Sequence, residues 1–196
     1  MTTVMTFEQF CEMPWESTLC FTGHRPDKLP DGAVLHGLNL TIYYYIRRAI
    51  ERGYTTFLTG MADGIDFTAA YYALHLRRTK PILRVIGIQP CSRGYEEYFR
   101  RSGYSVPHLR LLQQNVDGLV TLSGAAWDPK VYYRRNRLLV DHASGILAVC
   151  DDGRSGSMMT YQYARQKGLA YCRIYPQPAE PEIPVPENWP AERDGL

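Results

Sequence analysis

Short apolar runs alternate with longer segments of helical spacing along most of this chain. Six runs have the length of a buried strand, and they lie at 18–22, 54–59, 83–88, 118–122, 145–150 and 169–175. Continuous apolar runs of this kind indicate strands that are covered on both faces, as in parallel sheets. Segments with helical spacing lie between them at about 38–52, 64–78, 107–115, 132–141 and 157–167.

This alternation predicts an α/β fold that is Rossmann-like and doubly wound. A mostly parallel sheet of about six strands would carry helices on both faces, joined by right-handed crossovers. We expect three parts, which are an N-terminal helical extension at 1–17, the Rossmann-like domain at 18–175 and a Pro-rich C-terminal tail at 176–196. Prolines punctuate the tail so closely that we expect it to be extended or disordered.

Composition narrows the class of protein. The net charge of the 196 residues is +2, so the field of the whole molecule says little about nucleic acid. Five scattered cysteines include no C-x-x-C pair, and no His, Cys, Asp or Glu group has convincing metal-ligand spacing. No apolar stretch approaches the ~18 residues of a membrane span. We therefore expect a cytoplasmic protein with no membrane partner, no metal and no bound cofactor.

Glycine-rich turns follow the first, second and fifth predicted strands. In doubly wound sheets, ligands bind at the carboxyl ends of the strands, where the strand order reverses. Such turns can offer backbone N–H groups to an anion at a helix N-terminus. Arg25 and Arg135 could add planar side-chain donors for phosphate or carboxylate. The predicted ligand-binding residues are Gly23, His24, Arg25, Gly60, Met61, Ala62, Gly64, Asp66, Arg135, Asn136, Gly153, Ser155, Gly156 and Ser157.

Several of these side chains have a second interpretation that the sequence leaves open. His24 could donate to phosphate, act as a general acid near neutral pH or only shape its loop. Asp66 could accept a ribose hydroxyl or brace the glycine turn, and Asp63 is the expected N-cap of the following helix. Asn136 could orient a loop. The adjacent acids Asp151 and Asp152 would oppose a phosphate unless Arg154 compensates for their charge.

Two of the turns resemble a known superfamily. The run Thr59-Gly60-Met61-Ala62-Asp63-Gly64-Ile65-Asp66, together with Arg135-Asn136-Arg137 and Arg154-Ser155-Gly156-Ser157, resembles motifs of the Rossmann domain of DNA-processing protein A (DprA). The opening Thr22-Gly23-His24-Arg25-Pro26 is similar to the YpsA-like (DUF1273) proteins. Both groups belong to the SLOG superfamily, which includes the LOG phosphoribohydrolases. The resemblance covers about 18–175 and implies a Rossmann-like domain with a nucleotide-related pocket.

The chain departs from the phosphoribohydrolase branch at one position. Those proteins carry a Gly-Gly-x-Gly-Thr-x-x-Glu turn whose Glu serves catalysis. Aligning Gly156-Ser157 with its Gly-Thr puts Thr160 at the Glu position, although Arg135 matches the branch's Arg. A Thr cannot replace a carboxylate as a general acid.

Three functions are therefore expected, in descending order. The first is binding of a nucleotide or nucleotide-derived ligand, as a sensor, carrier or sequestering module rather than a fast enzyme. The second is hydrolysis of an N-glycosidic bond in nucleotides, for which Asp66 is the candidate catalytic carboxylate. The third is single-stranded DNA binding of the DprA type along an Arg/Tyr groove. A homo-oligomer could form through the tyrosine-rich helix that includes Tyr43, Tyr44 and Tyr45.

Overall fold

A seven-stranded parallel sheet forms the centre of the protein. The computed structural model describes residues 2–124 and 128–177. Every strand pair in that part of the chain is parallel, and the order is β1-β5-β4-β3-β2-β6-β7. The strands are β1 (Thr3–Val4), β2 (Thr18–Gly23), β3 (Thr56–Thr59), β4 (Arg84–Gln89), β5 (Gly118–Thr121), β6 (Gly145–Val149) and β7 (Ala170–Ile174). The doubly wound α/β fold expected from the alternation is confirmed.

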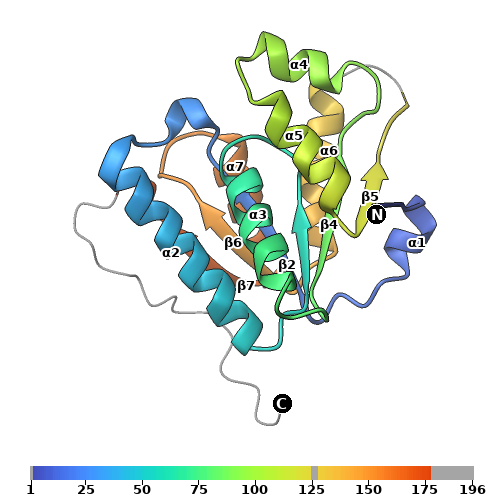
Figure 1. Cartoon of the computed structure of the whole chain (residues 1–196), viewed down its shortest axis with the longest axis horizontal. Helices are drawn as coiled ribbons and strands as arrows, with labels where there is room; N and C mark the ends of the chain where they lie inside the picture. The colour runs from blue at the N-terminus through green and yellow to red at the C-terminus, as the bar shows by residue number, and fades with distance from the viewer. Residues whose placement is uncertain (1, 125–127, 178–196) are drawn as a thin grey trace.

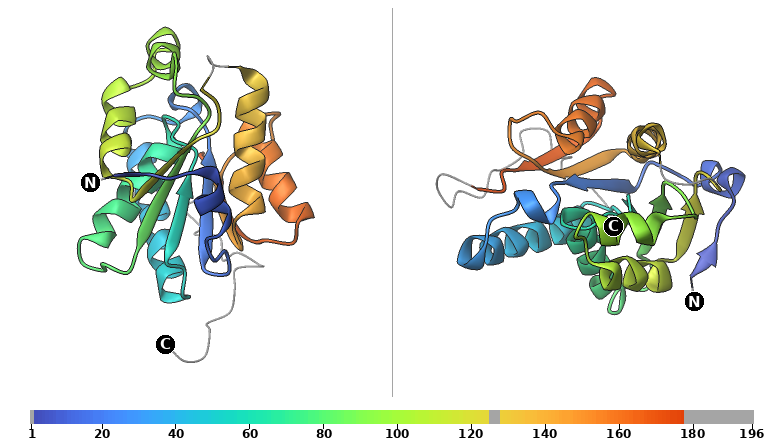
Figure 2. Two further views of the ribbon diagram at one scale, coloured as in Figure 1. Left: turned by 90° about the vertical axis from the view of Figure 1, so that its right-hand side faces the viewer. Right: turned by 90° about the horizontal axis from the view of Figure 1, so that it is seen from above.

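Helices cover both faces of the sheet, as the two views in Figure 2 show. One face carries α2 (Gly32–Glu51), α3 (Ile65–Arg77), α4 (Tyr95–Arg101) and α5 (Val106–Asn115). The other carries α1 (Phe7–Cys11), α6 (Pro129–Asp141) and α7 (Gly156–Gln166). The pleat of β2 explains the two layers, because Leu19 and Phe21 enter the first core and Cys20 enters the second.

The strand order reverses at β2, which places the ends of distant segments together. From β2 the chain proceeds through β3, β4 and β5 in one direction, and β6 and β7 lie on the other side (Figure 1). Cys20 of β2 is in register with Leu58 of β3 and with Ile146 of β6. Gly23 is in register with Val149, so the turns after β2 and β6 leave the sheet side by side.

The N-terminal segment differs from the expected helical extension. Thr3 and Val4 form the short edge strand β1, which pairs with β5, and only Phe7–Cys11 is helical. This strand raises the number of strands from the expected six to seven. A two-residue strand is too short to show the period-2 pattern of a strand, so β1 could not be predicted from the sequence. The predicted Pro-rich tail at 176–196 lies almost wholly outside the described residues, which end at 177.

Two helices also differ from expectation. The helix that was expected to begin at about residue 38 begins at Gly32. The prediction placed its start too late because the first turns are largely exposed and so carry no apolar stripe. The segment after β4 contains α4, which buries Tyr95 and Phe99 four residues apart against the core. The i,i+4 ion pairs Glu96–Arg100 and Glu97–Arg101 support its outer face. None of the helices in the described part of the chain combines the length and apolarity needed to cross a membrane.

Asp63 connects the β3–α3 turn to the start of α5, and it is not the expected helix N-cap. The N-cap of α3 is Gly64, at φ 84°, and it makes no side-chain capping bond. The buried Asp63 carboxylate accepts hydrogen bonds from the Gly64 N–H at 3.0 Å and the Ser105 N–H at 2.6 Å, and its Oδ1 lies 2.9 Å from His108 Nδ1. His108 in turn stacks on Phe67 of α3 with ring centroids 3.8 Å apart.

Replacing Asp63 with Ala is expected to lower the free energy of unfolding by about 2–4 kcal/mol. The change removes a charged acceptor and leaves the buried Gly64 N–H and the partly buried Ser105 N–H without a partner. Urea unfolding measures the loss. The matched control is Asp31→Ala, because Asp31 is an exposed N-cap without a side-chain capping bond and should cost less than about 0.5 kcal/mol. Equal losses in the two variants would contradict this role of Asp63.

Candidate functional site

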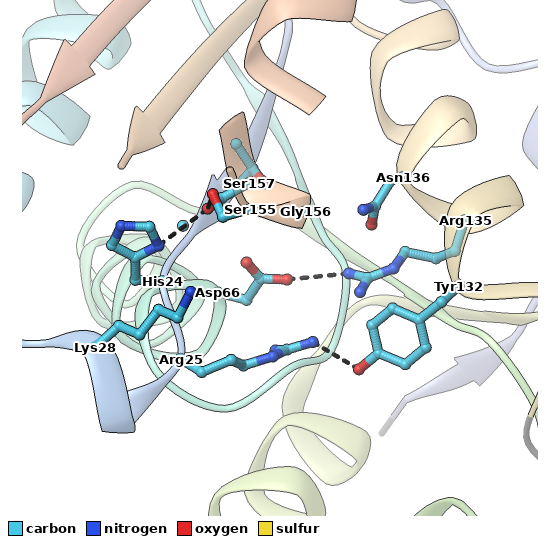
Figure 3. A pocket seen from close by; sticks show the side chains of 12 residues that line it. His24, Arg25, Lys28, Asp66, Tyr132, Arg135, Asn136, Ser155, Gly156 and Ser157 are labelled. Carbon is cyan, nitrogen blue, oxygen red and sulfur yellow. Dashed lines mark hydrogen bonds and ion pairs between the residues drawn. The ribbon is translucent and has the colours of Figure 1, made fainter. Parts of the chain in front are cut away.

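A polar cavity lies at the carboxyl ends of β2 and β6, where the strand order reverses. Its volume is about 220 Å³. The turn after β2, the start of α3, the middle of α6 and the start of α7 all contribute to its wall (Figure 3). The residues that line it are Thr22, Gly23, His24, Arg25, Lys28, Asp66, Tyr132, Arg135, Asn136, Ser155, Gly156 and Ser157.

A buried ion pair crosses this cavity. Arg135 Nη1 of α6 lies 3.1 Å from Asp66 Oδ2 of α3, and the Arg135 residue is only 2% exposed. The two residues are 69 positions apart in sequence. Within the described residues, Arg135 Nε has no hydrogen-bond partner. A buried donor without a partner carries a free-energy cost, which a ligand oxygen or an ordered water could remove.

The glycine turn after β3 makes room for this ion pair. A Cβ atom at Gly60 would overlap the Arg135 guanidinium and press against the Asp66 carboxylate. A Cβ atom at Gly64 would collide with the His24 carbonyl oxygen, which accepts the Ile65 N–H at 3.2 Å. These glycines therefore allow two other segments to approach closely, and their spacing does not by itself indicate a phosphate loop.

Tyr132 holds both arginines of the cavity. Its hydroxyl accepts a hydrogen bond from Arg25 Nη2 at 2.6 Å. Its ring lies 5.4 Å from the Arg25 guanidinium carbon and 4.7 Å from that of Arg135. Burial opposes the charge of Arg25, but the Tyr132 hydroxyl and the Asp66 carboxylate outweigh it and raise the pKa of Arg25. Arg25 thus stays a cation, with Asp63 O accepting from its Nη1 at 3.2 Å.

A second aromatic layer backs Tyr132. Tyr95 is buried, and burial raises the pKa of its hydroxyl well above the usual value. The protonated hydroxyl donates to Met61 O at 3.1 Å and so fixes the β3–α3 turn against α4. The Tyr104 ring also approaches Arg25, with its centroid 5.6 Å from the guanidinium carbon.

His24 links the first turn to the third. The Asp151 N–H donates to His24 Nε2 at 3.2 Å, and His24 Nδ1 lies 3.1 Å from Ser157 Oγ. An amide can only donate, so Nε2 accepts and Nδ1 carries the proton in this arrangement. The 3.3 Å approach of Asp151 Oδ1 to Nε2 would become an ion pair only on protonation. These contacts favour loop shaping over donation to a ligand.

The N-terminus of α7 forms one wall of the cavity. Ser155 is its N-cap, and its hydroxyl accepts the Met158 N–H at 3.1 Å. The first amides of a helix have no carbonyl partner within the helix, and Gly156 and Ser157 line the cavity at this point. The helix dipole adds partial positive charge there. Asn136 faces this turn from α6 (Figure 3).

The structure brings together nine of the predicted residues and leaves five outside the cavity wall. Those that line it are Gly23, His24, Arg25, Asp66, Arg135, Asn136, Ser155, Gly156 and Ser157. Gly60, Met61, Ala62 and Gly64 form the buried turn behind the ion pair, and Gly153 donates its N–H to Asp151 Oδ1 at 2.9 Å. The sequence prediction missed Thr22, Lys28 and Tyr132. Tyr132 could have been found, because it lies one helical turn before Arg135.

The two acids of the third turn have partners other than Arg154. Arg173 Nη2 of β7 lies 2.8 Å from Asp152 Oδ1. Burial opposes the charge of the Asp151 carboxylate, but the Gly153 N–H that Oδ1 accepts and the nearby Lys28 cation act against burial, and the pKa of Asp151 is lowered. Arg154, which the sequence offered as a compensating cation, is exposed.

Thr160 occupies the position that aligns with the catalytic Glu of the phosphoribohydrolases. Its hydroxyl donates to Gly156 O at 2.8 Å, so it is hydrogen-bonded within its own helix. Among residues 2–124 and 128–177, no group of three or more His, Cys, Asp or Glu side chains could hold a metal ion.

The ion pair gives a testable energetic prediction. Asp66→Ala leaves the Arg135 charge buried and unpaired, so it should cost about 3–5 kcal/mol of unfolding free energy. The double variant Asp66→Ala/Arg135→Met should recover at least half of that loss, because it removes both charges. Denaturant unfolding of the two variants and of Arg135→Met completes the cycle.

The exposed pair Glu97–Arg101 provides the matched control. The same cycle there, with Glu97→Ala and Arg101→Met, should give a coupling below about 1 kcal/mol. A coupling at Asp66–Arg135 as small as this would overturn the assignment of the buried pair as the organising contact of the cavity.

Comparison with known proteins supports the fold. No protein-family model matches the chain, and no curated protein matches it in sequence. Among solved structures it is similar to DprA from Streptococcus pneumoniae, with TM-score 0.56, 18% identity and coverage of 86% of this chain and 52% of that one. It is also similar to DprA from Helicobacter pylori, described for its single-stranded DNA binding mode, with TM-score 0.54, 19% identity and coverage of 84% and 67%. The chain thus spans about half to two thirds of these proteins and shares their Rossmann-like fold.

Proposed function

We propose that this chain binds a phosphate-bearing, nucleotide-type ligand in the cavity at the carboxyl ends of β2 and β6. The observation that carries the proposal is that cationic side chains and a helix N-terminus line the same cavity. Arg25, Lys28 and Arg135 contribute three cations against the single lining carboxylate of Asp66, and the α7 N-terminus adds its dipole. Helix N-termini with nearby arginines suit phosphate in both charge and geometry.

The charges in the cavity have unequal roles. Asp66 neutralises the charge of Arg135, so what Arg135 would contribute to binding is its unpartnered Nε donor rather than net charge. Arg25 contacts a hydroxyl and a carbonyl oxygen, so its charge can attract an anion. Lys28 is exposed at the rim, so its flexible side chain can adjust to contact a bound anion. Net attraction therefore comes mainly from Arg25, Lys28 and the helix terminus.

The volume of the cavity limits which part of the ligand it encloses. Pockets that bury a whole drug-sized ligand occupy roughly 300–1,000 Å³. The cavity of about 220 Å³ is smaller, and most of its lining residues have polar side chains, which suits a phosphoryl group with its sugar. A base attached to that sugar would lie outside it.

Binding has more support than turnover. A hydrolase for N-glycosidic bonds needs a carboxylate that can approach the sugar and exchange a proton. The Asp66 carboxylate is held by Arg135, and Thr160 bonds its own helix. This arrangement favours the sensor, carrier or sequestering role over the N-glycosidic hydrolase.

The first experiment titrates the protein with ribose 5-phosphate and measures affinity by calorimetry. Lys28→Glu reverses one charge at the rim without touching the buried pair, so it should weaken binding at least tenfold at low ionic strength. The control is Lys80→Glu, an exposed lysine in the turn before β4, which should leave affinity within about twofold of the parent. Equal effects of the two reversals, or no binding by the parent, would contradict the proposed site.

Single-stranded DNA is the second candidate ligand, and the likeness to the Helicobacter pylori protein favours it. The same cavity would then hold one phosphate of a strand, and the basic residues Arg134 and Arg137 of α6 would lie beside its path. A short thymidine oligonucleotide should bind with an affinity that falls steeply with salt, because several phosphates release counterions. Fluorescence anisotropy between 20 and 200 mM salt measures this slope. An affinity independent of salt, or absent at 20 mM, would exclude the strand.

A further inference from the structure

A second cavity lies between α6 and α7, beside the one already described. Its volume is about 300 Å³. The two helices lie next to each other along this side of the molecule, as both views in Figure 2 show. One wall carries Tyr133 and Arg137 of α6, and the other carries Met159, Gln162, Tyr163 and Gln166 of α7. We call it the α6–α7 groove.

The groove is continuous with the phosphate cavity. Asn136 and Gly156 line both. A Cβ atom at Gly156 would come within 4.0 Å of Asn136 Nδ2, so the two residues face each other where the cavities meet. This junction lies at the N-terminus of α7, where a phosphate would sit. A group attached to that phosphate can therefore extend directly into the groove.

The α6 wall suits a flat aromatic group. The Tyr133 ring is half exposed, and its hydroxyl accepts from Arg137 Nη1 at 3.2 Å. The Arg137 guanidinium also donates to the Tyr163 hydroxyl at 3.2 Å and lies 4.4 Å from the centre of that ring. Two tyrosines thus hold the guanidinium in one orientation. Aromatic rings and fixed guanidinium planes are the groups on which nucleic-acid bases stack.

The α7 wall adds polar and adaptable groups. Gln162 and Gln166 are exposed side-chain amides one helical turn apart, and an amide can both donate to and accept from the edge of a base. Met159 is half exposed between them and the junction, and its thioether packs well against aromatic faces. The groove thus combines stacking surfaces with hydrogen-bonding groups, which a bare phosphate does not need.

We propose that the α6–α7 groove is a base-binding subsite, so that one nucleotide unit spans the two cavities with its phosphate at the α7 N-terminus and its base against Tyr133. The inference rests on the proposed function and makes it specific for a nucleotide over other phosphate esters. The unit could be a free nucleoside monophosphate or one residue of a single strand. The recognising chemistry is the same for both.

The test compares ligands with and without a base. Affinities are measured by calorimetry for ribose 5-phosphate, the four nucleoside 5′-monophosphates and a 5′-phosphorylated thymidine tetranucleotide. Tyr133→Ala should weaken binding of the base-bearing ligands about tenfold, equivalent to about 1.4 kcal/mol, and change ribose 5-phosphate less than twofold. Tyr133→Phe keeps the ring and should resemble the parent. Tyr44→Ala removes a similarly exposed tyrosine from α2 and serves as the control.

A second variant approaches the groove from its other wall. Met159→Trp fills the space between the helices, so it should weaken the base-bearing ligands and leave ribose 5-phosphate unchanged. If these variants lose affinity only for the monophosphates, the ligand is a free nucleotide. If they lose affinity only for the tetranucleotide, the ligand is a strand. Both outcomes support the subsite.

Two results overturn the inference, and they are distinguishable. If the parent binds ribose 5-phosphate and Tyr133→Ala and Met159→Trp alter all ligands equally or none, the phosphate site stands and the base subsite is wrong. If the parent binds none of the ligands at low ionic strength, the proposed function fails and the subsite fails with it.

Discussion

The buried pair of Arg135 and Asp66 is the contact on which the candidate site depends. It joins α6 to α3 across the carboxyl edge of the sheet at a separation of 3.1 Å. Two charges leave water to form it, so its geometry has to be good for the folded state to tolerate it. That requirement explains Gly60, where any side chain would displace the guanidinium. The glycine-rich turn after β3 therefore leaves the space that the Arg135 guanidinium of the distant helix α6 occupies.

The same pair arranges the rest of the cavity. Tyr132 lies one turn before Arg135 on the same face of α6, so anchoring Arg135 places the Tyr132 ring between two guanidinium groups. Tyr132 then orients Arg25 of the β2 turn. On the opposite wall, His24 connects this turn to Ser157 at the start of α7. The turn after β2, α6 and the start of α7 thus enclose one cavity that carries positive charge.

Local pattern was sufficient to predict the fold and most of the cavity wall. Apolar runs and glycine turns identified six strands, and strand order in doubly wound sheets brought the turns after β2 and β6 together. The role of the β3 turn was not predictable, because the absence of a side chain at Gly60 makes room for Arg135, which lies 69 positions beyond Asp66 in the sequence. Lys28 was missed because nothing local distinguishes it from a solvated lysine. The strand at Thr3–Val4 is too short to have a period.

Amide NMR of the ¹⁵N-labelled protein during titration with ribose 5-phosphate would locate the phosphate site residue by residue. We expect saturable shifts concentrated on the amides of Gly23, Gly156 and Ser157, and a shift of the Arg135 side-chain Nε–H as it gains an acceptor. The amide of Lys80, which lies before the amino end of β4 and so away from the cavity, should stay unchanged. Saturable shifts centred on any other surface, or a spectrum that ribose 5-phosphate leaves unaltered at low ionic strength, would contradict the proposed phosphate site.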